Sequence, residues 1–172
     1  MPMPRWIAAA LAAVLMAAAP ALAGAWPGPT WAGSFYEMNS AAGTADFLDS
    51  ATIGDLDAPG SQAGALKRAA MVTVFATAQT VDESSTPYVI TSTGLAFDCV
   101  MPRYKITGIA FYDHAGDLLY TQNGDNTWTE LRPGAPSERM QRLVCGHAAW
   151  RGAPYLHGTM ADLRWRYVRG AH

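Results

Sequence analysis

The chain has 172 residues, half of them hydrophobic, and a formal net charge of −2 at pH 7. This weak acidity argues against a general nucleic-acid-binding protein, because such a protein presents a basic face. Beyond the first two dozen residues, no apolar run is long enough to cross a hydrocarbon core about 30 Å thick. No transmembrane segment is therefore expected in the rest of the chain.

The N-terminus predicts a signal peptide for export over residues 1–23. Arg5 precedes an apolar run over residues 7–19, and residues 21–23 (Ala-Leu-Ala) have the small-x-small pattern that signal peptidase cuts. Cleavage after Ala25 is an alternative, as is an uncleaved membrane anchor, for which the run is short. Because no cysteine follows the cleavage site, a lipid anchor is not expected. The predicted location is periplasmic or secreted.

Alternating and β-branched segments predict strands in the first half of the mature chain. The expected strands cover residues 31–38, 45–53 and 68–78. Residues 55–64, with two aspartates and two glycines, are expected to form a loop, and so are the polar residues 81–87.

The second half contains the clearest hairpin. One strand is expected through residues 89–90 or 95–97. Apolar residues at a spacing of two over 103–112, a turn at 113–116 that ends in glycine, and a returning strand over 117–122 predict a β-hairpin. The sequence thus predicts about six antiparallel strands.

A short helix is expected after this hairpin. Ser137 is a suitable N-cap, Glu138 suits the positive end of the helix dipole, and Gly146 suits the C-cap. The apolar stripe consists of Met140, Leu143 and Val144, and the side expected to face away consists of Arg139, Gln141 and Arg142. A helix of about nine residues is marginal on its own in water, so tertiary contacts must hold it.

The two cysteines, Cys99 and Cys145, both lie in the exported part of the chain. In an oxidising compartment, with no third cysteine to compete, they predict one disulfide; two buried free thiols are the alternative. The chain-entropy model assigns such a bond about 4 kcal/mol. The predicted fold is therefore α+β: an antiparallel β-meander of about six strands with a short C-terminal helix tied to the sheet by the disulfide.

Residues 148–172 are expected to form a basic and aromatic tail after a sheet domain of residues 24–147. The tail carries four arginines against one acid, Asp162. It is expected to end as a short helix or an edge strand, or else as a solvated, partly disordered end.

Several segments together resemble the surface-adhesin protein E family of Gram-negative bacteria. They are the run 97–105 (Phe-Asp-Cys-Val-Met-Pro-Arg-Tyr-Lys), the turn 112–116, Trp128, the segment 133–137 and the run 143–146 (Leu-Val-Cys-Gly). The resemblance covers about residues 31–146. It implies a small antiparallel sheet with a C-terminal helix tied by the disulfide. The named member is a lipid-anchored adhesin that binds host matrix and serum proteins, whereas this sequence lacks a lipidation cysteine and has an extra tail.

The sequence does not predict an enzyme, and no metal or cofactor is expected. Its histidines, which are not spaced as metal ligands, are His114, His147, His157 and His172. The segment 55–60 has two aspartates as in a calcium loop, but Leu66 stands where a bidentate glutamate is required. With both cysteines in a disulfide, a thiol nucleophile is not available.

The expected function is a non-catalytic binding or adhesion-like module of the cell envelope. The aromatic residues are too many for one small core face, so some are expected to line the second face of the sheet or a groove; completion of the core is the alternative. The candidate binding residues are Trp128, Tyr112, Trp165, Arg164, Arg166 and Arg169. The expected partner is an unidentified protein or a second copy in a homodimer. The alternative function is a periplasmic carrier of a small apolar or porphyrin-like ligand.

Overall fold

The computed structural model describes residues 31–56, 62–81 and 84–170, without the side chains of residues 84 and 85. The predicted signal peptide, its cleavage site and His172 lie outside the described residues. In chain order the elements are β1 (Gly33–Ala41), β2 (Thr44–Asp55), β3 (Leu66–Val81), β4 (Ser84–Asp98), β5 (Arg103–Tyr112), β6 (Leu118–Asn123), β7 (Thr129–Glu130), α1 (Pro136–Val144), β8 (Leu156–Gly158) and α2 (Met160–Gly170).

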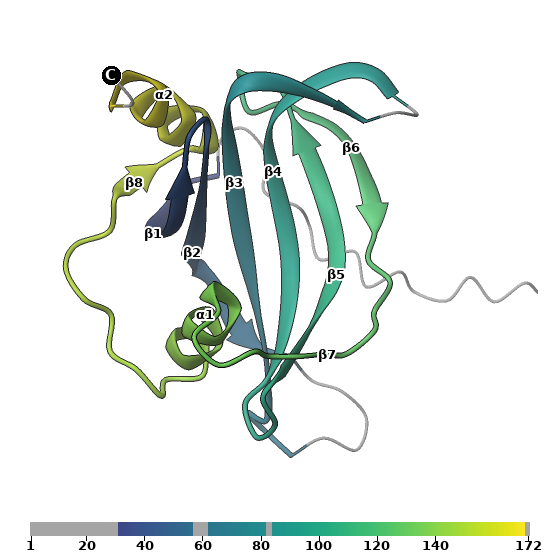
Figure 1. Cartoon of the computed structure of the whole chain (residues 1–172), viewed down its shortest axis with the longest axis vertical. Helices are drawn as coiled ribbons and strands as arrows, with labels where there is room; N and C mark the ends of the chain where they lie inside the picture. Colours follow the sequence, from purple (N-terminus) through teal and green to yellow (C-terminus); the bar gives the residue numbers. More distant parts are fainter. Residues whose placement is uncertain (1–30, 57–61, 82–83, 171–172) are drawn as a thin grey trace, which may run out of the picture.

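The described strands form one twisted antiparallel sheet in the order β6-β5-β4-β3-β2-β1-β8, with β7 beside β5 (Figure 1). Strands β1 to β6 are the expected meander. The described residues hold eight strands rather than about six, because β7 and β8 add to it. These two strands have only two and three residues, which is too short for a period-two pattern in the sequence.

The prediction of a loop over residues 81–87 is wrong for most of these residues. Strands β3 and β4 are paired as far as Val81 and Ser84, and Gln79 lies opposite Tyr88. The two alternatives for the next strand, residues 89–90 and 95–97, belong to the same strand β4. Polar residues can lie in a strand where the backbone is paired. Strand propensity depends on how well a side chain fits a half-buried, pleated surface more than on its hydrophobicity.

Two hydrophobic clusters lie on opposite faces of the sheet. Phe47 and Leu48 are consecutive and both fully buried, yet they belong to different clusters, because neighbouring side chains in a strand point to opposite faces. The cluster around Phe47 includes Met160 and Leu163 of α2. The cluster around Leu48 includes the predicted apolar stripe of α1. The two helices therefore pack against different faces.

Helix α1 begins two residues earlier than expected. Its N-cap is Ala135, which makes no side-chain capping bond, and Pro136 is the first helical residue. Proline has a fixed φ suited to the first helical position. The helix therefore begins at Pro136, and Ser137 lies inside its first turn instead of capping it. The C-terminus is as predicted: Gly146 has φ +75°, and the amides of Gly146 and His147 donate to the carbonyls of Leu143 and Arg142. These two bonds make a Schellman motif.

The C-terminal tail forms both an edge strand and a helix. Strand β8 pairs antiparallel with residues Gly33–Phe35 of β1. Helix α2 then starts at a capping box: the Thr159 hydroxyl accepts from the amide of Asp162, and the Asp162 carboxylate accepts from the amide of Thr159. Since α2 supplies buried residues to the cluster around Phe47, the tail shares a core with the sheet.

Candidate functional site

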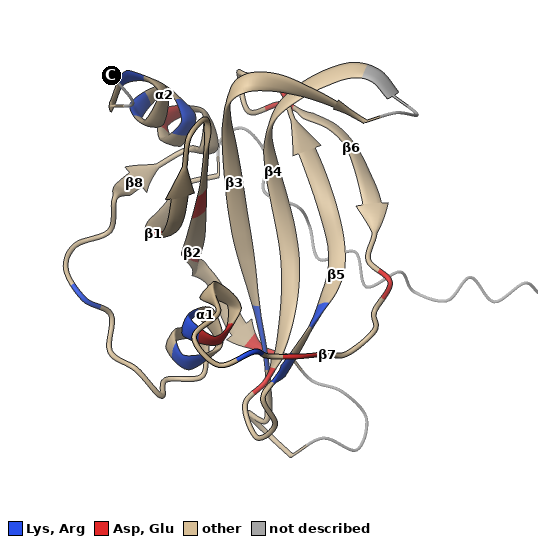
Figure 2. Cartoon of the chain, viewed as in Figure 1, with Lys and Arg blue, Asp and Glu red and all other residues tan. Residues whose placement is uncertain are grey.

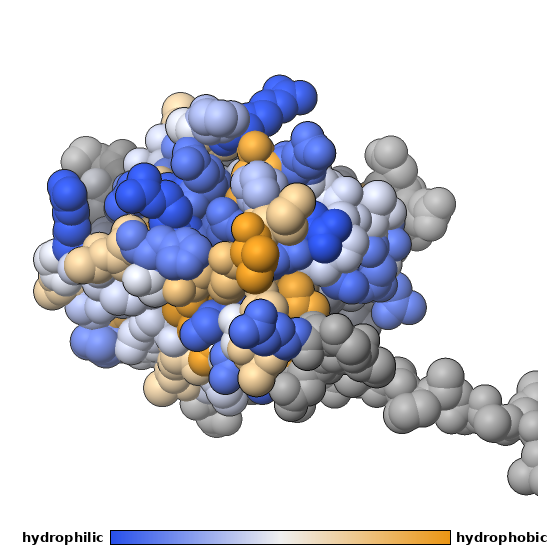
Figure 3. All heavy atoms as spheres, turned by 90° about the horizontal axis from the view of Figure 1, so that it is seen from below, coloured by the Kyte–Doolittle hydropathy of each residue, from blue (hydrophilic) through white to orange (hydrophobic). Residues whose placement is uncertain are grey.

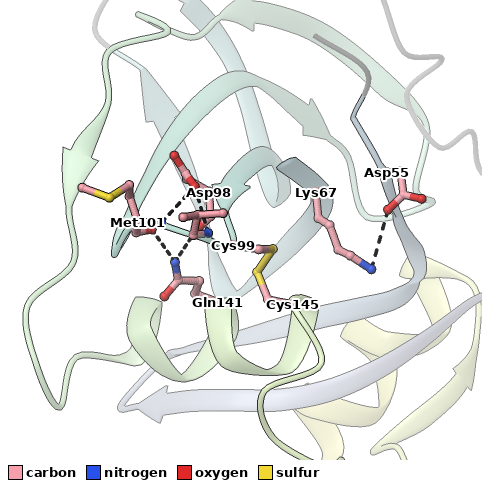
Figure 4. Close-up of a disulfide and its surroundings, with 8 residues drawn as sticks. Asp55, Lys67, Asp98, Cys99, Met101, Gln141 and Cys145 are labelled. Atoms are coloured by element: carbon pink, nitrogen blue, oxygen red, sulfur yellow. Dashed lines mark hydrogen bonds and ion pairs between the residues drawn. A yellow bond between two sulfur atoms is a disulfide. The ribbon is translucent and has the colours of Figure 1, made fainter. Parts of the chain in front are cut away.

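The predicted disulfide between Cys99 and Cys145 is present, with 5.5 Å between the Cα atoms. Cys99 lies in the turn after β4, and Cys145 is the C-cap of α1. The bond fixes the end of α1 against the β4–β5 turn, as the close-up shows (Figure 4). The same turn exposes Val100 and Met101. Seen from below, the molecule shows apolar residues gathered among hydrophilic ones (Figure 3).

Gln141 provides a second link between α1 and this turn. The expectation that it faces away from the sheet is wrong, because its side chain is buried. Its amide Nε2 donates to the carbonyl of Asp98 and, at 2.9 Å, to the carbonyl of Met101 (Figure 4). One side chain thus satisfies two carbonyl groups of a turn that lies about 40 residues earlier in the chain.

Replacing Gln141 with leucine is expected to lower the free energy of unfolding by about 2 kcal/mol, because it leaves two carbonyl groups without their donor. Urea unfolding of the oxidised protein measures the change. Arg142→Leu, an exposed position on the same helix, is the control and should change stability little. Equal stability of the two variants would show that water satisfies these carbonyls as well as Gln141 does.

Asp98 holds the other side of the turn. Its carboxylate accepts from the amides of Val100 and Met101 at 3.0 Å and from Arg103 Nε at 2.9 Å. Burial alone would raise the pKa of Asp98, but the two amide bonds and the Arg103 guanidinium outweigh burial and lower it. The ionised carboxylate therefore stabilises the fold above its usual pKa, and this contribution is lost as the pH falls through the lowered pKa.

Asp98→Asn is expected to be less stable than the parent at neutral pH and to lose less further stability below about pH 4. The midpoint of urea unfolding, measured over a pH series, tests this. The control is Asp55→Asn, which removes an exposed carboxylate that lies 3.7 Å from Lys67. It should leave the change of the urea midpoint with pH as it is in the parent. A parallel pH dependence in the parent and Asp98→Asn would contradict the assigned role of Asp98.

Trp128 lies in a basic and aromatic cluster next to β7. The Arg103 guanidinium lies 4.8 Å and the Lys105 ammonium 5.2 Å from the centre of its ring. The ring is partly exposed, so this pair of cations and the indole face solvent together. Cation–π contacts of this kind contribute about 0.5–1 kcal/mol each at exposed positions.

Tyr112, another candidate binding residue, is fully buried and belongs to the cluster around Phe47. Burial raises the pKa of its hydroxyl, and within the described residues this hydroxyl has no hydrogen-bond partner. Its side chain is therefore part of the core and not of the surface.

The outer side of α2 brings together three of the predicted residues. Trp165 is 58 % exposed, and the Arg169 guanidinium lies 4.1 Å from its ring centre. Arg166 lies 4.8 Å from the ring of Tyr155. Arg164 differs from them, because it donates to the Ala76 carbonyl of β3 at 3.5 Å. We call Trp165, Arg166 and Arg169 the α2 surface.

A row of aromatic rings crosses the sheet from β3 to β6. The rings of Phe75 and Tyr88 are 5.8 Å apart, those of Tyr88 and Phe111 4.9 Å, and those of Phe111 and Tyr120 4.4 Å. Phe111 is buried and the other three are partly exposed. Burial and the neighbouring Tyr120 raise the pKa of Tyr88. This aromatic row is the best match to the predicted aromatic face.

Two grooves lie along β1. The first has a volume of about 570 Å³ and lies between β1, α1 and the segment that leads to β8; the second has about 530 Å³ and lies between β1 and the end of α2. Glu37 and Tyr155 line both. The lining of the first groove includes three arginines, Arg139, Arg142 and Arg151. Basic residues gather on both helices, and the middle of the sheet carries few charges (Figure 2).

The described residues hold no group of three or more His, Cys, Asp and Glu side chains arranged to bind a metal ion. His114 and His147 are exposed. His157 on β8 lies opposite Ser34 on β1, with 2.8 Å between Nδ1 and the hydroxyl oxygen. This contact links the two strands at the edge of the sheet.

Comparison with known proteins agrees with this architecture. Neither helix in the described part of the chain is long and apolar enough to cross a membrane. No curated protein matches the chain. The family model described as surface-adhesin protein E matches residues 35–146, which is well over half of the chain. That region contains β1 from Phe35 onward, strands β2 to β7, helix α1 and both cysteines. The chain therefore belongs to the surface-adhesin protein E family.

Proposed function

We propose that this chain is an exported, non-catalytic binding protein of the cell envelope that contacts partner proteins through two surfaces: the α2 surface and, on the other face of the sheet, the aromatic row. Its family suggests surface adhesion, and the predicted signal peptide supports export. Mass spectrometry of the mature protein, with and without reductant, tests export because it reports the cleavage site and the disulfide together.

The observation that carries the proposal is the division of α2 into two sides. Met160 and Leu163 are buried in the core, which fixes the helix on the sheet. Trp165, Arg166 and Arg169 are exposed on the same helix. Tryptophan, tyrosine and arginine are the residues that most often dominate the binding energy of protein interfaces. Because the helix is fixed on the sheet, its backbone loses little conformational entropy on binding.

The test compares partner capture by the parent and by the triple variant W165A/R166A/R169A. Shortening the chain after Gly146 is a poor test, because it also removes the buried residues of α2. Leu118→Ser, an exposed position on β6 at the other end of the sheet, is the control. Each protein is immobilised and exposed to envelope and matrix extracts, and captured proteins are quantified by mass spectrometry.

The triple variant is expected to recover at least about tenfold less of the captured partner, which corresponds to about 1.4 kcal/mol. The Leu118→Ser variant should match the parent. If all three proteins recover the same background set, the proposed contact through α2 is wrong.

A further inference from the structure

The edge strand β1 is covered by β8 over only part of its length. Strand β8 pairs with Gly33–Phe35, and the Tyr155 amide donates to the Phe35 carbonyl at 2.7 Å. From Tyr36 onward, no other described strand pairs with this side of β1. Backbone groups alternate in direction along a strand, so the amide and carbonyl of Glu37 face the same open side as those of Phe35; the register of β1 shifts only after Glu37. A free edge of this kind is a template for another strand.

The two grooves lie along this free edge. One is lined by residues 36–38 of β1 and the other by Glu37 and residues 40–43. They share Glu37 and Tyr155, so together they follow β1 from the end of β8 towards the β1–β2 turn. A path of this shape suits an extended chain better than a compact ligand.

The wall of the first groove is cationic and aromatic. Among the described residues, the ion pairs are Lys67–Asp55 and Arg103–Asp98. The guanidinium groups of Arg139, Arg142 and Arg151 therefore have no described carboxylate partner. The groove also contains the side chains of Tyr36 and Trp150, whose rings are tilted by 43° to each other with 4.3 Å between ring centres. Unpaired guanidinium groups bind carboxylates strongly, often through two parallel hydrogen bonds.

We propose that this groove binds an extended, acidic segment of a partner protein, which adds its backbone to the free edge of β1 and places its carboxylates against Arg139, Arg142 and Arg151. Main-chain bonds supply affinity in such strand addition, and alternate side chains supply specificity. The residues used lie outside the α2 surface, so the proposal is independent of the contact through α2.

The lining of the groove favours a peptide over a polyanionic glycan. Glu37 and Glu138 also line it, and Glu138 accepts from the Gly134 amide at 2.6 Å. A uniformly charged sulfated chain lacks the regularly spaced amides that match a strand edge. A peptide with acidic residues at alternate positions can place all of them on the one face of the added strand that meets the arginines, while its backbone amides follow the free edge of β1.

The probe is a fluorescein-labelled nonapeptide of alternating glutamate and valine, whose binding to the oxidised protein is followed by fluorescence anisotropy. Three comparisons separate the contributions of peptide charge, peptide backbone hydrogen bonds and groove cations to binding. A glutamine-for-glutamate peptide removes the charge, and a peptide N-methylated at alternate residues removes the backbone donors. The variant R139Q/R142Q/R151Q removes the groove cations, while R68Q/K105Q/R132Q removes the same charge from residues outside the groove lining.

The groove variant is expected to weaken binding about tenfold, in keeping with three partly exposed ion pairs, and added salt should weaken binding by the parent. The control variant should weaken binding much less. Both altered peptides should bind more weakly than the probe. Glu37→Gln, which removes a carboxylate from the free edge, is expected to tighten binding about threefold. A misfolded variant could not produce this gain.

Four results would overturn the proposal. One is no measurable binding of the probe. A second is equal weakening by the groove and control variants. A third is binding of protoporphyrin IX or a heparin oligosaccharide, abolished in the groove variant, when the peptide does not bind. The fourth is a dimer in velocity sedimentation that excludes the peptide and dissociates in the groove variant, since a second copy would then be the occupant.

Discussion

Replacing both Cys99 and Cys145 with serine is expected to lower the free energy of unfolding by about 4 kcal/mol. The two residues are 46 positions apart, so the bond removes the conformational freedom of a long loop from the unfolded chain. In the folded protein it fixes a nine-residue helix that would be marginal on its own. A loss of this size is comparable to much of the stability of a small domain, typically about 5–15 kcal/mol.

Urea unfolding of the parent and of the double serine variant measures the effect. A reductant should destabilise the parent to about the same extent and should not affect the variant. A change below about 1 kcal/mol in the free energy of unfolding would contradict the view that the disulfide stabilises the protein by restricting the unfolded chain.

Leu163→Ala is expected to lower the free energy of unfolding by about 3 kcal/mol. Leu163 has no exposed surface and packs in the cluster that contains Phe35 and Phe47. Truncating it leaves a cavity between α2 and the sheet, and the neighbouring β-strands can fill that cavity only in part.

The control is Trp165→Ala on the same helix, where the removed ring is mostly exposed and the expected loss is about 0.5 kcal/mol or less. Thermal and urea unfolding of the two variants give the comparison. If Leu163→Ala were as stable as Trp165→Ala, α2 would be an appendage and would not be part of the core.

Local chemistry made several elements predictable. The turn after β5 is one example: the Asp113 carboxylate accepts from the amides of Ala115 and Asp117, and Gly116 has φ +82°. Aspartate and glycine favour such turns through interactions within four or five residues of the chain. The C-terminus of α1 at Gly146 is predictable for the same reason, and the pair of cysteines leaves only one possible partner for each.

Positions governed by distant contacts were not predictable. In β5, Gly108 lies opposite Gly94 and Ile106 opposite Leu95, so Thr107 is an extra residue. This β-bulge changes the face on which later side chains lie. Ile106 consequently packs with the α1 cluster and Tyr112 with the α2 cluster. A constant spacing of two in the sequence cannot show that change.

Gln141 was missed because its partners are carbonyl groups some 40 residues away, and a polar residue on a short helix is usually exposed. Helix α2 is different, because a local signal exists. Thr159 and Asp162 have the spacing of a capping box; the buried Met160 lies within the box and the buried Leu163 follows it directly. That motif, weighed with the arginines of the tail, would have favoured a packed helix over an edge strand.

The position of the disulfide also sets how the protein responds to mechanical load. Suppose a pulling force acts at residues 31 and 170. The covalent bond carries tension directly from the β4–β5 turn to the end of α1, so β5, β6, β7 and α1 lie in a loop that the force does not stretch. The 46 positions that separate the two cysteines withhold about 160 Å of contour length at roughly 3.3–3.6 Å per residue. Only the first four strands and the C-terminal segment can lengthen under load while the bond is intact.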